Sequence, residues 1–282
     1  MAIRIAICAP SATFPRELVA PVREVASCFE GVELHFHEQC FYEAGHFAGT
    51  DEQRLEALLD CANDPTIDAV WFARGGYGSN RICEAALTYL SRDADRKVFL
   101  GSSDGGYLLG SLYKAGIGRP VHAPMPLDVK RANGGEAVER VLAWMKGDAE
   151  TLEPTLDHRP TVAFNLTTLA MLAGTRLMPD LRGHVVMVEE VSEYLYSVDR
   201  LFFHLVEVLK GMDIAGLRLG RVSDVPENDR EFGSDAEAIA RDWCARAGIQ
   251  YLGRADIGHD HANRIVPFGM QRAFAGGGST AD

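Results

Sequence analysis

The chain has 282 residues, of which 47% are hydrophobic, and 40 acidic against 28 basic residues give a formal net charge of −12. This length fits one large or two modest domains, and the acidic balance argues against a nucleic-acid partner or an anionic-membrane surface. No apolar run approaches the roughly 20 residues of a membrane span, and the first residues form a strand pattern instead of a secretory signal. We therefore expect a cytoplasmic protein.

The first part of the chain alternates strand-like and helix-like segments. The expected strands are residues 3–8, 32–37, 67–73 and 98–100. The expected helices are residues 16–29, a segment that begins with the capping box Thr50-x-x-Gln53, and residues 107–115. This order predicts an α/β fold with a parallel sheet, in which ligands bind at the carboxyl ends of the strands.

The pattern changes at residues 147–160, a polar stretch with two prolines that reads as a linker. Beyond it we expect helices at 165–174, 198–210 and 234–247 and strands at 184–190 and 217–222. Ser234 is the expected cap of the last helix, because Glu237 follows three residues later. The sequence thus predicts one domain at residues 1–150, a second at 151–272, and a flexible tail at 273–282.

The six cysteines lie far apart and form no Cys-x-x-Cys pair. They are Cys8, Cys28, Cys40, Cys61, Cys83 and Cys244. Because most of them stand within apolar segments, we expect reduced core residues and neither a disulfide framework nor a zinc site.

The most informative motif is Gly101-Ser102-Ser103-Asp104-Gly105, which follows a short apolar run and precedes an apolar helix. Glycines at these positions let the backbone turn sharply and expose a serine hydroxyl between strand and helix. Ser103 is therefore a candidate nucleophile. A turn that binds phosphate, or that only supports the fold, is the alternative.

A nucleophilic serine needs a base and a group that orients the base. His259 lies in a polar loop at 258–263, and Glu189 and Glu190 end an expected strand. Adjacent strand residues point to opposite faces, so only one of the two glutamates can serve. A surface role for His259, or metal binding together with His261, remains open at this stage.

Several stretches together resemble the LD-carboxypeptidase family of serine peptidases. In chain order they are Ile7-Cys8-Ala9-Pro10-Ser11, Ala48-Gly49-Thr50-Asp51, Arg74-Gly75-Gly76-Tyr77-Gly78, Gly101-Ser102-Ser103-Asp104, His122-Ala123-Pro124-Met125, Asn165-Leu166-Thr167, Val188-Glu189-Glu190-Val191, Asp199-Arg200, Gly258-His259 and Pro267-Phe268-Gly269. The order and spacing match over nearly the whole chain. The Arg-Gly-Gly-Tyr-Gly and Gly-His…Pro-x-Gly elements are the most specific.

The resemblance implies a flavodoxin-like N-terminal domain and a smaller α+β C-terminal domain, with the active site between them. It implies a Ser103–Glu189–His259 triad and an oxyanion hole made by the amides of Gly76 and Asp104. It further implies a homodimer that needs no metal or other cofactor. The side chain of Asp104 is expected to cap the following helix.

Two further residues are weaker candidates for substrate binding. Arg74 could pair with a terminal carboxylate of the substrate or form a structural ion pair, and Tyr77 could cover the substrate or only pack. Asn165 is expected to anchor a turn.

The resemblance implies a serine carboxypeptidase that hydrolyses an L,D-amide bond and releases terminal D-alanine from murein tetrapeptide. Hydrolysis of a peptidyl-nucleotide or related acyl-amide is an alternative, and a non-catalytic small-ligand binding protein is a third. The chain departs from the family pattern at Ser102, Gly105–Gly106, Ala123 and Ala163–Phe164, and it ends soon after Gly269. These departures leave the triad intact but change the expected pocket wall.

Overall fold

A computed structural model describes residues 2–269, so the tail predicted at 273–282 lies outside the described residues. The larger sheet has six strands in the order β10-β5-β4-β3-β1-β2. Their bounds are β1 Ile3–Cys8, β2 Val32–Phe36, β3 Ala69–Phe72, β4 Val98–Gly101, β5 Arg119–His122 and β10 Val266–Pro267. The strands are parallel except for β10, which pairs antiparallel with β5. The order of β1 to β5 is that of flavodoxin-like sheets, as expected.

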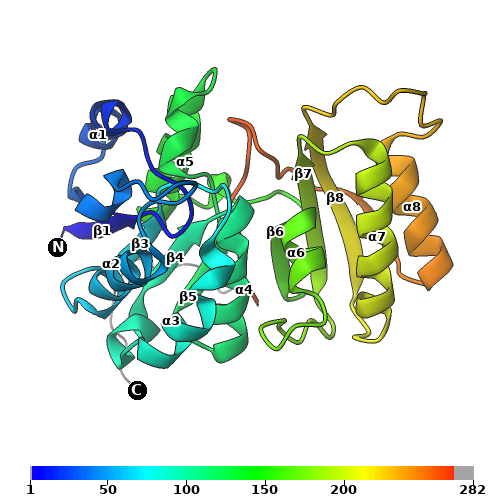
Figure 1. Cartoon of the computed structure of the whole chain (residues 1–282), viewed down its shortest axis with the longest axis horizontal. Coiled ribbons are helices and arrows are strands. Elements are labelled where there is room, and N and C mark those ends of the chain that lie inside the picture. Colours follow the sequence, from blue (N-terminus) through cyan, green and yellow to red (C-terminus); the bar gives the residue numbers. More distant parts are fainter. Residues whose placement is uncertain (1, 270–282) are drawn as a thin grey trace.

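Five helices cover the two faces of this sheet (Figure 1). They are α1 Val19–Ser27, α2 Asp51–Asn63, α3 Cys83–Tyr89, α4 Gly106–Ala115 and α5 Gly134–Met145. Apolar residues of α1 and α5 pack with one face of the sheet, and those of α2, α3 and α4 pack with the other. Because both faces are covered, β3 and β4 are buried at every position.

The smaller sheet consists of β6 Thr161–Asn165, β7 Val185–Val191, β8 Gly216–Ser223 and β9 Tyr251–Arg254, in that order. Helices α6 Leu166–Leu172, α7 Leu195–Lys210 and α8 Ala236–Ala247 connect these strands. All three strand pairs are parallel. The smaller unit is therefore α/β in arrangement and not segregated α+β, because each crossover between parallel strands carries a helix.

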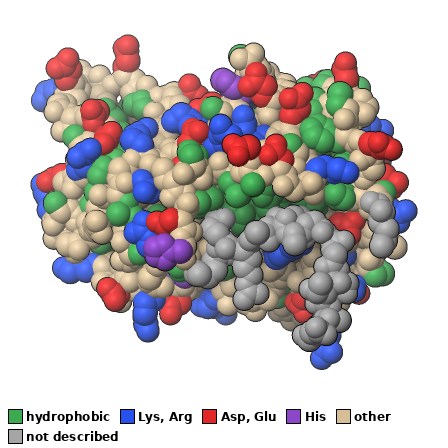
Figure 2. All heavy atoms as spheres, turned by 180° about the vertical axis from the view of Figure 1, so that it is seen from behind, with side chains coloured by type: hydrophobic (Ala, Val, Ile, Leu, Met, Phe, Trp, Pro, Cys, Tyr) green, Lys and Arg blue, Asp and Glu red, His purple; other side chains and the backbone are tan. Residues whose placement is uncertain are grey.

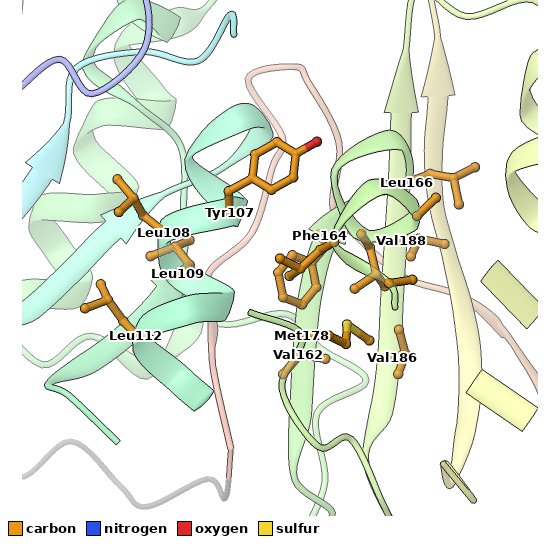
Figure 3. Packing of buried hydrophobic residues seen from close by; sticks show 14 of the residues in the cluster. Tyr107, Leu108, Leu109, Leu112, Val162, Phe164, Leu166, Met178, Val186 and Val188 are labelled. Atoms are coloured by element: carbon orange, nitrogen blue, oxygen red, sulfur yellow. The ribbon is translucent and has the colours of Figure 1, made fainter. Parts of the chain in front are cut away.

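The two units share one hydrophobic cluster, which joins α4 of the larger unit to β6, β7 and α6 of the smaller one (Figure 3). Glycines in α4 allow the close approach. A Cβ at Gly106 would lie 3.0 Å from Cγ2 of Thr168, and one at Gly110 would lie 2.8 Å from Cδ2 of Leu172. The start of α4 is thereby fixed against the start of α6, and β10 returns from the smaller unit to the edge of the larger sheet.

The structure also corrects local predictions. The capping box at Thr50 and Gln53 is confirmed, but the cap of α8 is Asp235, which accepts a hydrogen bond from the amide of Ala238, and not Ser234. The helix expected at 16–29 is divided into a 3-10 turn, Arg16–Leu18, and α1. Strand β5, helix α5 and strands β9 and β10 were not predicted. The division of the chain near residue 150 stays a prediction.

The surface and the cysteines fit the composition. On the face seen in Figure 2, acidic and basic side chains are interspersed. Among the described residues, no helix is long and apolar enough to cross a membrane. All six cysteines are free thiols, and all but the exposed Cys28 are buried, as expected for core residues.

Candidate active site

Ser103 occupies a strained turn between β4 and α4. Its backbone φ is +54°, in the left-handed region that residues other than glycine rarely adopt. The flanking glycines are required by packing, because a Cβ at Gly101 or Gly105 would lie 2.6 or 2.9 Å from Cδ2 of Phe72. The Gly-x-Ser-x-Gly motif therefore builds the strand–turn–helix geometry typical of a nucleophilic serine.

The loop at residues 74–78 lies directly against this serine. A Cβ at Gly75 would be only 2.7 Å from Oγ of Ser103 and 3.5 Å from the amide nitrogen of Asp104. The next residue, Gly76, has a φ of +116°, which a side chain would strain. Two backbone amides, those of Gly76 and Asp104, thus belong to segments that meet at the serine. An oxyanion hole needs two such donors directed at one point beside the nucleophile.

The carboxylate of Asp104 holds the same loop in place. It accepts hydrogen bonds from the hydroxyl of Ser11 and from the amides of Gly78 and Ser79, at 3.3 and 2.8 Å for the amides. Burial raises the pKa of Asp104, and these hydrogen bonds oppose the rise. The expectation that this side chain caps α4 is wrong, because its partners lie in two other loops.

Glu189 and His259 form a hydrogen-bonded pair. Glu189 lies near the end of β7 and is fully buried, and its Oε2 is 2.6 Å from Nδ1 of His259. Nε2 of His259 is also buried and has no partner among the described residues, so no hydrogen bond joins it to Ser103 here. An oriented imidazole with a free Nε2 is suited to accept a proton, and such contacts often tighten only with substrate bound.

The charge of this pair is set by burial and by Glu189. Burial works against the charged imidazolium, but the charge and the hydrogen bond of Glu189 outweigh it, so the pKa of His259 lies above its ordinary value. Within residues 2–269, no three histidine, cysteine or carboxylate side chains are grouped as metal ligands. The geometry therefore gives His259 a carboxylate partner in place of the surface role that the sequence left open.

Glu190 has different partners, as strand alternation predicts. It accepts hydrogen bonds from Nδ2 of Asn165 at 2.6 Å and from the amide and hydroxyl of Thr167 at 2.8 and 2.7 Å. Asn165 caps α6 by accepting from the amide of Thr168 at 3.1 Å, and this is the anchoring role expected for it. The hydroxyl of Thr168 donates to the carbonyl of Ser103 at 3.2 Å. Asn165 is the register neighbour of Glu189, so residues 165–168 connect the serine turn to the strand that carries Glu189.

Two residues of the larger unit hold the loop that carries His259. Asn263 accepts at Oδ1 from the amide of Gly258 at 3.2 Å, and the same oxygen is 3.1 Å from Nε2 of His122. Arg140 of α5 donates to the carbonyls of His261 and Asn263 at 2.6 and 3.1 Å. These contacts were not predicted from the sequence, although His122 ends the strand next to the serine strand, where site residues are expected.

Arg74 and Tyr77 belong to the loop at residues 74–78, which lies against Ser103. Arg74 is half-buried and donates to the carbonyls of Gly75 and Thr13, at 3.2 and 3.1 Å. It has no carboxylate partner among the described residues, and burial lowers the pKa of its guanidinium. Tyr77 is 46% exposed and packs beside the rings of His46 and Phe47. The structural ion pair considered for Arg74 is thus not formed within residues 2–269.

Comparison with known proteins places this geometry in context. Residues 5–123 match the LD-carboxypeptidase N-terminal domain, and residues 160–273 match the LD-carboxypeptidase C-terminal domain. A relative from Synechocystis is 30% identical to the chain, over 89% of the chain and 84% of its own length.

Two other relatives cover nearly the whole chain. The murein tetrapeptide carboxypeptidase of Pseudomonas aeruginosa is 26% identical, over 97% of the chain and 93% of its own length. The crystal structure of muramoyltetrapeptide carboxypeptidase from Oxalobacter formigenes superposes with a TM-score of 0.80 at 27% identity, and the match covers 96% of each chain. The similarity therefore spans both units.

Proposed function

Because this chain belongs to the LD-carboxypeptidase family of peptidases, we propose that it is a serine carboxypeptidase whose triad is Ser103, Glu189 and His259. The observation that carries the proposal is the buried Glu189–His259 pair, which leaves Nε2 of the imidazole free. The strained turn at Ser103 supports the nucleophile.

The proposed reaction follows from these atoms. Oγ of Ser103 attacks the scissile carbonyl carbon while Nε2 of His259 accepts the hydroxyl proton. Glu189 accepts the Nδ1 hydrogen, fixes the tautomer and stabilises the imidazolium. His259 then gives the proton to the leaving amine. In the second half of the reaction, His259 accepts a proton from water, the water oxygen attacks the acyl carbon, and His259 returns the proton to Oγ of Ser103.

The proposed oxyanion hole is formed by the amides of Gly76 and Asp104. Their support is the contact between the loop at 74–78 and Ser103, which the carboxylate of Asp104 maintains. Removing one donor from such a site typically costs about 3 kcal/mol of transition-state stabilisation.

The proposed substrate is a murein tetrapeptide with a C-terminal D-alanine, after the names of the relatives from Pseudomonas aeruginosa and Oxalobacter formigenes. A carboxypeptidase must bind a free carboxylate close to the serine. Arg74 is the proposed partner, because it belongs to the loop that lies against Ser103 and has no carboxylate partner among the described residues. Tyr77 is exposed at the same loop and is proposed to cover the substrate. A cytoplasmic location and a homodimer are further proposals that follow from the sequence.

The test is to incubate the wild-type protein and Ser103→Ala with muramoyl-tetrapeptide and to detect released D-alanine by mass spectrometry. We expect release by the wild type alone. A peptidyl-nucleotide is assayed in parallel. Cleavage of that compound with no release of D-alanine would replace the murein substrate with the second class, and tight binding without turnover of either would favour a binding protein.

A further inference from the structure

The Glu189–His259 pair has a buried neighbour that the proposed mechanism does not use. The imidazole of His122 is 1% exposed, and its Nδ1 accepts no hydrogen bond from any described residue. The second carboxylate oxygen of Glu189, Oε1, is equally buried and has no donor within residues 2–269. A buried acceptor left without a donor costs about 1–3 kcal/mol, so both atoms need an explanation.

The hydrogen bonds of His122 fix which of its nitrogens carries the proton. Oδ1 of Asn263 already accepts from the amide of Gly258, so Nε2 of His122 must donate to that oxygen. Burial lowers the pKa of His122, which keeps the ring neutral. In a neutral ring with hydrogen on Nε2, Nδ1 has only a lone pair. Both unpartnered atoms, Nδ1 of His122 and Oε1 of Glu189, are therefore acceptors and cannot bond to each other.

The position of His122 joins both halves of the active site. In the larger sheet it is the register partner of Gly101 on one side, two residues before the serine, and of Val266 on the other. Oδ1 of Asn263, which is 3.1 Å from Nε2 of His122, also accepts from the amide of Gly258, the residue before His259, so the ring is tied to the loop that carries the partner of Glu189. One molecule with two hydrogens to donate satisfies both acceptors, and buried water does this in many proteins.

Building on the proposed triad, we propose that an ordered water bridges Nδ1 of His122 and Oε1 of Glu189, and that His122 is a positioning residue of the active site. The water donates one hydrogen to each acceptor. It holds the carboxylate so that Oε2 faces His259, and it spreads part of the charge of Glu189 away from the imidazolium.

Other charged groups surround the pair and stay unchanged in the test. Asp128, from the 3-10 turn after β5, and Glu190, from β7, both act with Glu189 to raise the pKa of His259. The proposed water opposes the effect of these charges, because its hydrogen bond to Oε1 offsets part of the negative charge of Glu189. If it is lost, Glu189 holds the imidazolium more strongly, and the pKa of His259 rises further.

The test follows the titration of His259 by NMR of the imidazole nitrogens, which needs no substrate. His122→Phe removes the acceptor and is expected to raise the pKa of His259 by about half a unit or more. His122→Gln keeps an N–H donor for Asn263 and an oxygen for the water, so it is expected to titrate as the wild type does. The matched control is His184→Phe, at a buried histidine that bonds to Tyr113 beyond the other end of β7. We expect no shift in the control.

A high-resolution crystal structure of the wild type supplies a second readout that does not depend on the folding of any variant. A water within hydrogen-bond distance of both acceptors supports the inference. A protein donor at that point, no density there, or a wild-type titration in His122→Phe would overturn it. Because neither readout uses turnover, the role of His122 would stand even if the murein substrate were wrong. With an active substrate, kcat of His122→Phe should fall about tenfold with little change in KM.

Discussion

Gly75 provides a sharp test of the active-site geometry, because a single methyl group should block the serine there. A Cβ at this position would lie 2.7 Å from both Cβ and Oγ of Ser103. The backbone of Gly75 is not in the left-handed region, so alanine is compatible with its conformation. The expected damage from Gly75→Ala therefore arises from the overlap with Ser103 and not from a strained backbone.

The magnitude follows from the overlap. Non-bonded heavy atoms are most stable at about 3.5–4.0 Å, so the serine or the loop must move by about 1 Å. Overpacking of this kind costs about 1–3 kcal/mol of folding stability. A displacement of about 1 Å at a reacting group costs about 100-fold in rate. We expect Gly75→Ala to lower kcat at least 100-fold while the protein remains folded.

The assay combines D-alanine release with the thermal unfolding midpoint. Gly135→Ala in α5 is the matched control, since the nearest atom to its Cβ, Cγ2 of Val25, is 3.9 Å away. The control should keep wild-type kcat. If Gly75→Ala also turned over at the wild-type rate, the loop at 74–78 could not lie against the attacking oxygen in the working enzyme, and the proposed oxyanion hole would be wrong.

Four further predictions concern the other site residues. Ser103→Gly relieves the left-handed strain at this position, so it should unfold at a higher temperature than Ser103→Ala, by about 1 kcal/mol of stability, and calorimetry of the two inactive variants checks this. In the wild type, kcat/KM should rise with pH as His259 loses its proton, at a pH above the ordinary pKa of histidine. In Glu189→Gln the imidazole stays buried but loses the neighbouring negative charge, so the rise should move to lower pH. The plateau value of kcat/KM in this variant should also fall about 100-fold or more. The Glu189–His259 pair should also stabilise the fold fully below about pH 6.5, the pKa of histidine in the unfolded chain. That contribution is lost as the pH rises through the higher pKa of His259 in the folded protein. Denaturant titrations of the wild type and Glu189→Gln at several pH values measure the difference. Arg74→Met should raise KM about 10- to 100-fold for a substrate with a free terminal carboxylate and leave a C-terminally amidated analogue unaffected; equal effects on both would exclude the carboxylate role.

The sequence by itself determined the parts of this protein that depend on local pattern. Alternating strand and helix segments predicted the parallel sheet, because the two periodicities differ and the capping box at Thr50 marks a helix start. The glycines around Ser103 predicted the turn, since no other residue fits against Phe72. The two neighbouring glutamates predicted that only one could face the histidine, and Glu189 does.

Only the tertiary structure decided which distant residues meet. Strand β10 has two residues, too short for a sequence pattern to reveal, yet it brings the His259 loop back to β5. The partners of Asp104, and the pairing of His122 with Asn263, join positions far apart in the chain. Such contacts depend on strand order and register, which the hydrophobic pattern of a single segment does not encode. The charge state of the buried site depends on the same packing, because burial and neighbouring charges together set each pKa.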